Sequence, residues 1–232
     1  MEFYEVINKR RSVRKYTNQK VEAEKINRAL DAAILAPNSS NMQTWEFYWV
    51  RSPNKKKQVV EACLSQPAAA TAQELIVCVS RIDTWNRNRK LVIQQLKSLP
   101  DVSPSVFAYY EKLMPIVYYQ DFFGLVGPLK KFIMSVTGLF RPIPREPAFR
   151  SDLFETVSKS AALGCENLML ALTAEGLGSC PMEGLDSARV KRCLGLGRNA
   201  HVVMVVSAGY TDLEGIYGER MRLDRSLFVK EV

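Results

Sequence analysis

The sequence predicts a single α+β domain of 232 residues. Helical periodicity dominates the chain, and only a few short segments are apolar and β-branched enough to form strands. These strands are not separated by regular βαβ crossovers with a glycine-rich first turn, which argues against a Rossmann sheet. Hydrophobic residues make up 47% of the chain, enough to bury one large core, and no repeat divides the sequence. We therefore expect residues 1–232 to form one domain.

The expected elements follow from the spacing of apolar residues along the chain. Phe3, Val6 and Ile7 have helical spacing, and a second helix ends where Pro37 interrupts it. Aromatic and β-branched runs such as WEFYWV predict strands. The predicted elements are helices over 2–10 and 22–36, a strand at 45–50, a short helix from about Lys55, a strand at 75–79, helices over 152–175 and from Asp186, and a strand at 202–207.

The helix predicted over 152–175 is apolar almost all round from Ala161 onward. Such a helix belongs in the centre of a core or in a dimer interface rather than on a surface. Gly176 and Gly178 follow it, where a left-handed cap is expected. The run GLGSCPMEGLD at 176–186 is by itself most simply a connector between helices, although backbone N–H groups in such a turn can also point at a ligand.

Residues 100–150 differ from the rest of the chain. Tyrosines and phenylalanines cluster in the first half, and GLVGPLKKFIMSVTGLF then leads to the proline-rich RPIPREP. Proline, glycines and two lysines interrupt the apolar part, so it lacks the roughly 20 unbroken apolar residues of a membrane-spanning helix. A lid over a ligand pocket is the first interpretation, followed by an excursion into a dimer interface and then by a membrane-surface helix over 122–140.

The composition argues against several classes of protein. The five cysteines form no CxxC pair, and the single histidine, His201, lies in the apolar run HVVMVVSAG. Reduced structural cysteines are therefore expected, without a metal site or a Ser-His-Asp triad. The net charge of +8 is spread among acidic residues, which favours a solvated surface, or a phosphate-facing patch, over a nucleic-acid partner. No secretory signal is visible near the N-terminus, so a cytoplasmic location is expected.

Two arginine-rich segments could bind an anion. The first places three guanidinium groups and a hydroxyl within 10–14, and in the second two arginines alternate over 220–222, on one face of an extended chain. The planar fork of arginine makes bidentate hydrogen bonds that suit a phosphate or the edge of a heterocycle. An exposed basic loop is the alternative for each segment taken alone. The candidate residues are Arg10, Arg11, Ser12, Arg14, Arg220 and Arg222.

The stretch 38–43 offers side-chain amides and hydroxyls directly before an aromatic strand. Loops of this composition can ring a heterocycle with hydrogen bonds, but they are also ordinary turns. Taken singly, neither this stretch nor the other segments select one ligand.

In their order and spacing, these segments resemble the FMN-dependent nitroreductase family. The resemblance extends over nearly the whole chain except 100–150. It departs at Gln43-Thr44-Trp45, where family members commonly read Gln-Pro-Trp, so the turn is less rigid here. The matching pieces are RRSVRKY (10–16), APNSSNMQTWEF (36–47), SQPAAATAQELIVCV (65–79), GLGSCPMEGLD (176–186) and YGERMRLDR (217–225).

The resemblance implies a three-layer sandwich with a mainly antiparallel or mixed sheet flanked by helices. It also implies an intertwined homodimer that binds FMN at the subunit interface, with the C-terminal SLFVKEV as an exchanged strand. The segment 100–150 would be a variable insertion that lines the substrate pocket.

Individual FMN contacts are implied by the same resemblance. Gln66 would meet the flavin with its side-chain amide, and Glu183 with Gly184 would meet N5 and O4 with their backbone. The phosphate, the ribityl chain and the pyrimidine edge would be held by Arg10, Arg11, Ser12 and Arg14, with Arg220 and Arg222 at the phosphate. Pro37, Asn38, Ser39 and Asn41 would approach from the partner subunit, and Gln43 is the remaining FMN-binding candidate.

The implied activity is NAD(P)H-dependent oxidoreduction by a ping-pong mechanism. NADH or NADPH would deliver hydride and leave, and a nitroaromatic, a quinone or another electron-poor small molecule would then be reduced in the same pocket. No protein side chain is needed as a general acid or nucleophile, because the redox chemistry belongs to the cofactor. One alternative is a reductive dehalogenase or flavin-modifying member of the family, with a lid around Tyr109, Tyr110, Glu111 and Lys112. The other is a non-enzymatic module that binds FMN or a membrane.

Overall fold

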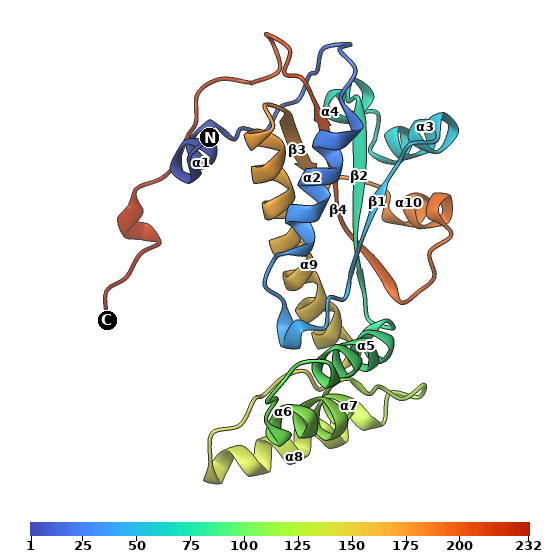
Figure 1. The fold of residues 1–232 in the computed structure, drawn as a ribbon, viewed down its shortest axis with the longest axis vertical. Helices are drawn as coiled ribbons and strands as arrows, with labels where there is room; N and C mark the ends of the chain where they lie inside the picture. The colour runs from blue at the N-terminus through green and yellow to red at the C-terminus, as the bar shows by residue number, and fades with distance from the viewer.

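The computed structural model describes all 232 residues and contains a four-stranded sheet (Figure 1). Its strands are β1 (Trp45–Trp49), β2 (Glu74–Arg81), β3 (Gly178–Met182) and β4 (Ala200–Gly209). Their order across the sheet is β1-β2-β4-β3, and every neighbouring pair is antiparallel. The predicted α+β class is confirmed.

Helices and helical turns make up most of the remaining ordered elements. The α-helices are α1 (Phe3–Lys9), α2 (Ala23–Ile34), α3 (Pro53–Ala62), α4 (Pro67–Ala70), α5 (Trp85–Lys97), α6 (Pro104–Ala108), α7 (Met114–Tyr118), α8 (Val126–Phe140), α9 (Arg150–Ala174) and α10 (Ser187–Leu194). The 3₁₀ turns are η1 (Ser39–Asn41) and η3 (Arg225–Leu227), and η2 (Tyr109–Leu113) is a π-helical turn.

The sheet is covered by helices on both faces, as in a three-layer sandwich (Figure 1). Successive side chains of a strand point to opposite faces. Leu75, Val77 and Val79 of β2 accordingly pack into a core with α3, α4 and α10, whereas Ile76 and Cys78 pack against α2 and α9. The sandwich expected from the family resemblance is confirmed, with an entirely antiparallel sheet.

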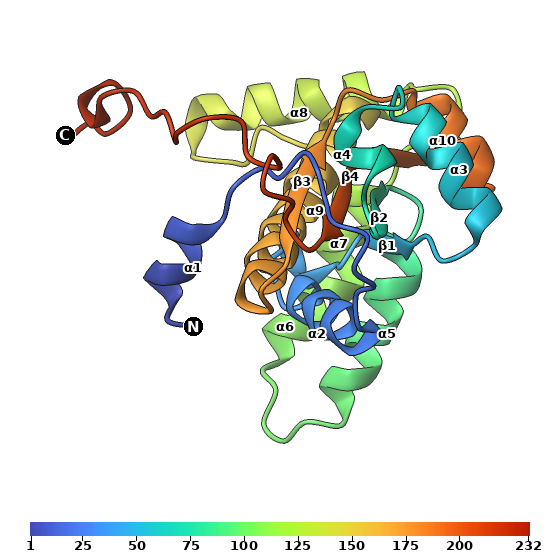
Figure 2. The ribbon, with the colours of Figure 1, turned by 90° about the horizontal axis from the view of Figure 1, so that it is seen from above.

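The helices from α5 to α8 form a group at one end of the sandwich (Figure 1), and α8 runs across the outside of this group (Figure 2). A small core joins the group to the start of α9, where Met114 and Tyr118 pack against Leu153 and Val157. The segment 100–150, for which the sequence left three interpretations, is therefore mostly helical and anchored to the sandwich.

The boundaries of the elements predicted from the sequence are confirmed to within one or two residues, but α4, α5 and β3 were not predicted, nor were the separate helices within 100–150. The run 176–186 was expected as a connector because it is rich in glycine and contains Pro181. Proline has no N–H to donate and is tolerated on an edge strand, and β3 pairs only with β4. The left-handed cap is present at Gly176, with φ of 80°.

Both ends of the chain extend away from the sandwich on the same side (Figure 1). After residue 210 the chain forms no further strand, and every residue beyond 220 is exposed. The exchanged C-terminal strand requires a second subunit and stays a prediction. No helix is both long enough and apolar enough to cross a bilayer.

Candidate functional site

The two arginine-rich segments meet in one pocket of about 220 Å³, although they are separated by some 200 residues in the sequence. The first segment reaches it because Val13 donates its backbone N–H to the Ser179 carbonyl of β3 (2.9 Å), and Arg14 donates its own to Gly215 (2.7 Å). A Cβ on Gly178 would lie 2.7 Å from Cγ2 of Val13, so this glycine permits the close approach. The lining residues are Arg10, Arg11, Ser12, Arg14, Ile216, Tyr217, Glu219, Arg220, Met221 and Arg222.

The positive charge of this arginine pocket is not balanced by carboxylates. None of its five arginines forms a salt bridge, and Glu219 is the only acidic residue in the lining. Desolvation, together with repulsion from Arg222, Arg10 and Arg11, lowers the pKa of Arg220. A cluster of like charges in a concave site is stabilised by a bound anion.

The arginines of the pocket have different roles within the chain. Arg220 donates hydrogen bonds to the carbonyls of Ile7 (3.3 Å), Asn8 (2.9 Å) and Arg10, so its guanidinium fastens the C-terminal end of α1. Arg11 donates to the Gly218 carbonyl (2.7 Å). Arg10 has no side-chain partner, Arg14 only stacks 5.3 Å from the Tyr217 ring centre, and Arg222 donates only to its neighbour. The guanidinium groups of Arg10, Arg14 and Arg222 are therefore free to contact a ligand.

A second group of candidate residues lies at the other end of β3. The side-chain amide of Gln66 donates to the carbonyls of Cys63 (3.0 Å) and Gly184 (3.2 Å). The backbone N–H groups of Glu183 and Gly184 are exposed and have no partner within the chain. Two adjacent free N–H groups can bind an acceptor atom such as a ring nitrogen or a carbonyl oxygen.

Strand β3 connects the arginine pocket to these N–H groups. Ser12 pairs with Ser179 near the start of the strand, and Glu183 follows four residues later, about 13 Å away at the rise of a β-strand. Cys180 lies between the arginine pocket and these N–H groups. Burial raises the pKa of its thiol, and the charges of Arg14 and Arg10 only partly offset that rise. The two groups thus form one elongated surface along the edge strand, with cations at one end and hydrogen-bond donors at the other.

The amide-rich stretch 38–43 forms a tight loop of unusual backbone geometry. Ser40, Asn41 and Gln43 have φ values of 54°, 50° and 46°, in the left-handed region that non-glycine residues rarely adopt. The Asn38 side chain accepts the backbone N–H of Gln43 (2.7 Å), and Asn88 of α5 donates to the carbonyls of Met42 and Gln43. Strained backbone of this kind is concentrated at functional sites.

Within one chain this loop is remote from the arginine pocket. Ser39 donates its N–H to the Ser160 hydroxyl (3.2 Å), and Ser160 precedes the end of α9 by 14 residues, roughly 21 Å of helix. The loop also follows α2, on the opposite face of the sheet from α4 and α10, which flank Gln66 and Gly184 (Figure 1). The structure therefore brings the sequence-predicted residues into three places and does not unite them in a single subunit.

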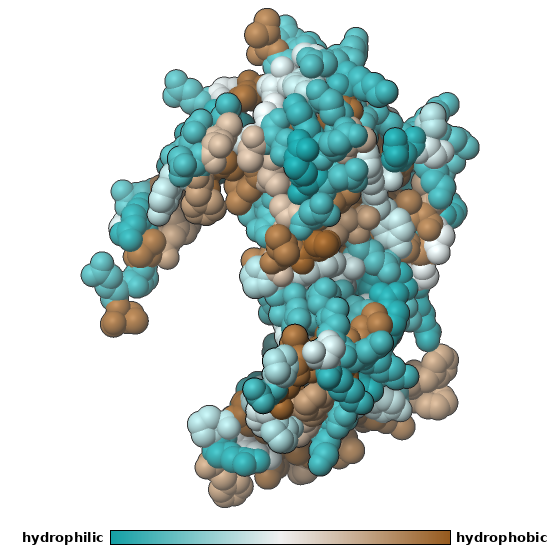
Figure 3. Space-filling view, in the orientation of Figure 1, coloured by the Kyte–Doolittle hydropathy of each residue, from teal (hydrophilic) through white to brown (hydrophobic).

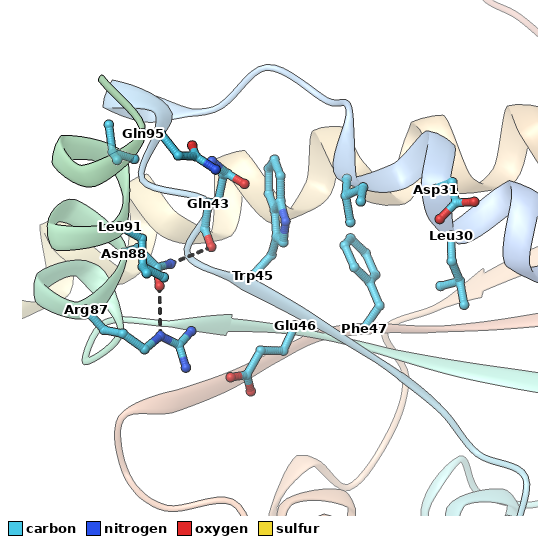
Figure 4. Close-up of a pocket in the computed structure, with 12 residues that line it drawn as sticks. Leu30, Asp31, Gln43, Trp45, Glu46, Phe47, Arg87, Asn88, Leu91 and Gln95 are labelled. Carbon is cyan, nitrogen blue, oxygen red and sulfur yellow. Dashed lines mark hydrogen bonds between the residues drawn. The ribbon is translucent and has the colours of Figure 1, made fainter. Parts of the chain in front are cut away.

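The sequence did not predict a larger cleft of about 480 Å³ between α2, β1 and α5 (Figure 4). Gln43, Trp45 and Phe47 point into it from the loop and β1, and Asn88 holds the Gln43 carbonyl at one end. Tyr217 also lines the arginine pocket; it opens the matching piece YGERMRLDR but was not among the predicted site residues. The aromatic strand WEFYWV was the available signal for the cleft, but which of its side chains line the cleft could be assigned only once the sheet order was known.

Comparisons with known proteins identify the family and the fold. The model of the Nitroreductase family matches residues 7–114 and 142–210. An NADH dehydrogenase of Thermus thermophilus is 28% identical over 224 residues, which cover 94% of this chain and 90% of the relative. Iodotyrosine deiodinase 1 of Pongo abelii is 25% identical over 225 residues, 95% of this chain and 65% of the relative. A protein of Exiguobacterium sibiricum solved in complex with FMN has a TM-score of 0.73 and 21% identity, covering 100% of this chain and 98% of that one.

Proposed function

The chain belongs to the nitroreductase family, and from this premise we propose that it is an FMN-dependent oxidoreductase that uses NADH or NADPH to reduce an electron-poor small molecule. The observation that carries the proposal is the arginine pocket, whose five guanidinium groups are accompanied by a single carboxylate, joined along β3 to two free backbone N–H groups. An anion at one end and a hydrogen-bonding heterocycle at the other are the two ends of FMN. The residues present therefore fit this cofactor.

At the phosphate end, Arg10, Arg14 and Arg222 supply the cationic donors that are free in the chain. Ser12 adds a hydroxyl donor, and Arg11 contributes charge while it holds the Gly218 carbonyl. Arg220 also lines the pocket, and its guanidinium donates to three backbone carbonyls. Besides the phosphate contact that the resemblance implies, we assign it the role of fixing α1 and Arg10 at the rim of the pocket.

At the ring end, the N–H groups of Glu183 and Gly184 are oriented by the turn after β3, and Gln66 fixes that turn through the Gly184 carbonyl. FMN, when bound, supplies the hydride-transfer chemistry. The protein supplies donors that favour negative charge on the reduced ring, and it needs no general acid or nucleophile of its own.

A second copy of the chain completes this proposed site. Pro37, Asn38, Ser39 and Asn41, with Gln43, lie too far from the arginine pocket of their own subunit to meet the same ring. In a homodimer they would approach the flavin of the partner subunit. The extended C-terminal segment suits such an interface, because Leu227 and Phe228 are exposed there and a second subunit would bury them.

Reductive dehalogenation is a second candidate function, which the similarity to iodotyrosine deiodinase 1 supports. The structure adds that Tyr109 and Tyr110 of η2 contact the strained loop that the proposed dimer brings to the flavin. Glu111 and Lys112 are exposed beside them and could select a zwitterionic aromatic substrate. Halide release from halogenated tyrosines under reducing conditions would distinguish this activity from the reduction of nitroaromatics and quinones.

An absorbance spectrum of the purified protein tests the proposal directly. Flavin bands between 300 and 550 nm should be present, or appear after FMN is added, and should bleach when NADH or NADPH is added without oxygen. Protein that stays colourless after incubation with FMN would contradict the proposed function, and bands that neither nicotinamide bleaches would contradict the proposed electron donor.

A further inference from the structure

Helix α8 turns its largest apolar side chains toward solvent. Leu125, Leu129, Phe132, Val136 and Leu139 follow one another at intervals of four, three, four and three residues, so they form one stripe along the helix. All five are exposed, and Phe132 and Leu139 keep 66% and 80% of their accessible surface. Figure 3 shows hydrophobic atoms along this lower end of the molecule.

The inner face of α8 cannot accept these side chains. A Cβ on Gly127 would lie 2.6 Å from the Phe149 ring, and the guanidinium of Arg145 lies against Gly138, where it donates to the carbonyls of Met134 (3.1 Å) and Gly138 (3.0 Å). Lys130 donates to the Val117 and Tyr119 carbonyls at the end of α7. Small and polar groups therefore face the protein and large apolar groups face outward, the reverse of an ordinary surface helix.

The start of the helix is fixed, so the exposed stripe is a defined surface. The Asp121 carboxylate accepts the backbone N–H groups of Phe123 (3.1 Å), Leu125 (3.0 Å) and Val126 (2.9 Å). These bonds hold Phe122 and Phe123 in the turn before α8, and both rings are exposed, Phe122 to 79%. The apolar stripe, with this phenylalanine pair at its start, is called the α8 face below.

The α8 face lies in a part of the chain that the family model does not match. The family model matches the chain up to residue 114 and resumes at 142, leaving 115–141 unmatched. The α8 face is thus carried by a stretch of the chain that the family model leaves unmatched, so the matched residues do not assign it a partner.

The charged residues of the stretch 122–145 are all basic, and Asp121 and Glu146 stand immediately before and after it. Because Lys130 and Arg145 donate to backbone carbonyls of the chain, Lys131 and Arg141 are the cations available beside the α8 face. An apolar face carrying phenylalanine and leucine, flanked by cations, matches helices that lie in the headgroup region of anionic membranes. Helix α8 has 15 residues, which span about 22 Å, so it could not cross a bilayer.

We propose that α8 docks the protein on the surface of an anionic lipid bilayer. The phenylalanine pair and the apolar stripe insert at the boundary between headgroups and acyl chains, and Lys131 and Arg141 contact lipid phosphates. Because α8 runs across the outer end of the helical group (Figure 2), its whole length can lie flat on a membrane while the sandwich stays in water. This docking is independent of the proposed redox activity.

Co-sedimentation with vesicles tests the proposal. The protein should bind vesicles of phosphatidylcholine with phosphatidylglycerol, bind vesicles of phosphatidylcholine alone more weakly, and lose affinity at high salt. The Leu139→Ser variant should bind less well, and Phe132→Ser/Leu139→Ser should bind at least about tenfold less, because two apolar contacts are removed. The matched control is Leu213→Ser, since Leu213 is a fully exposed leucine on a different loop.

Three results would overturn the proposal: no binding of the unaltered protein to either vesicle, equal binding by the α8 variants, or a larger oligomer in solution that Phe132→Ser/Leu139→Ser disrupts without any vesicle binding. The last result would mean that a second copy covers the α8 face. Far-ultraviolet circular dichroism and the thermal unfolding midpoint of each variant would show that the fold is intact. Vesicle binding is measured without FMN or nicotinamide, so its outcome does not depend on the proposed redox function.

Discussion

The Tyr109 hydroxyl lies 2.6 Å from the Ser40 hydroxyl, and the neighbouring Tyr110 donates to the Ser40 carbonyl at 3.1 Å. Ser40 sits in the left-handed region of backbone conformation, at the centre of the amide-rich loop. The π-helical turn η2 thus holds a strained residue that would face the flavin of a second subunit. Such strain persists only where surrounding contacts fix it.

Replacing Tyr109 with Phe should loosen this loop. The variant loses a hydrogen bond worth about 1 kcal/mol, and we expect the catalytic efficiency with the electron acceptor to fall several-fold while FMN affinity changes less. Steady-state kinetics with a quinone acceptor would measure it. Tyr119→Phe is the matched control, because its hydroxyl makes no hydrogen bond in the chain. Identical kinetics of the two variants would show that η2 does not position the loop.

Arg14→Ala should weaken FMN binding. A charge-assisted hydrogen bond contributes about 1.5–3 kcal/mol, so the dissociation constant should rise roughly 10- to 100-fold. Titration of apoprotein with FMN, followed by flavin fluorescence, gives that constant. The control is Arg51→Ala, since Arg51 also stacks on an aromatic ring, Trp49 at 4.7 Å, but lies outside the arginine pocket. An unchanged dissociation constant for Arg14→Ala would remove this residue from the proposed site.

Arg220→Ala should release α1 from the body. Three backbone carbonyls lose their donor, and we expect trypsin to cleave after Lys9, Arg10 or Arg11 markedly faster in the variant. Limited proteolysis of the apoprotein, analysed by mass spectrometry, measures this without reference to FMN. Arg225→Ala is the control, because its side chain is exposed and unpaired. Equal cleavage rates would mean that Arg220 does not fasten the helix.

The cysteines should differ sharply in reactivity. Burial raises the pKa of Cys63 to about 11, and Cys78, Cys165 and Cys180 are also buried, whereas Cys193 is partly exposed. In native protein at pH 8, a maleimide should therefore label Cys193 quickly and the other four slowly. Rapid labelling of four or five cysteines per chain would contradict the burial seen here.

The same raised pKa has a consequence for stability. The Cys63 thiol keeps its proton in the folded chain but loses it near pH 8.5 when unfolded, so unfolding releases a proton between about pH 8.5 and 11. The free energy of unfolding should fall as the pH rises through this range. Denaturant titrations at pH 8 and pH 10.5 would detect the fall, and Cys63→Ala should reduce it.

Much of the molecule followed from local sequence alone. Apolar periodicity located α2, α9, β1, β2 and β4, because a helix or strand that buries one face must repeat its apolar residues at the period of its backbone. The arginine segments and the amide-rich loop were also recognisable, since the chemistry of a guanidinium or an amide is a property of the residue. Their order along the chain then indicated the family.

Other features depended on contacts between residues far apart in the sequence. Pro181 and the glycines around it concealed β3 from an analysis of the sequence. The segment is a strand because one of its edges pairs with β4. Arg220 was recognisable as a candidate phosphate ligand, but its hydrogen bonds to α1 depend on how the C-terminal segment packs beside that helix. The inverted orientation of α8 was equally hidden, because periodicity gives an apolar stripe but not the direction in which it points. The sequence thus determined which residues could bind and where the predicted elements begin and end. Tertiary packing decided which faces meet and which further segments pair or pack, since long-range hydrogen bonds and close contacts have no local signature.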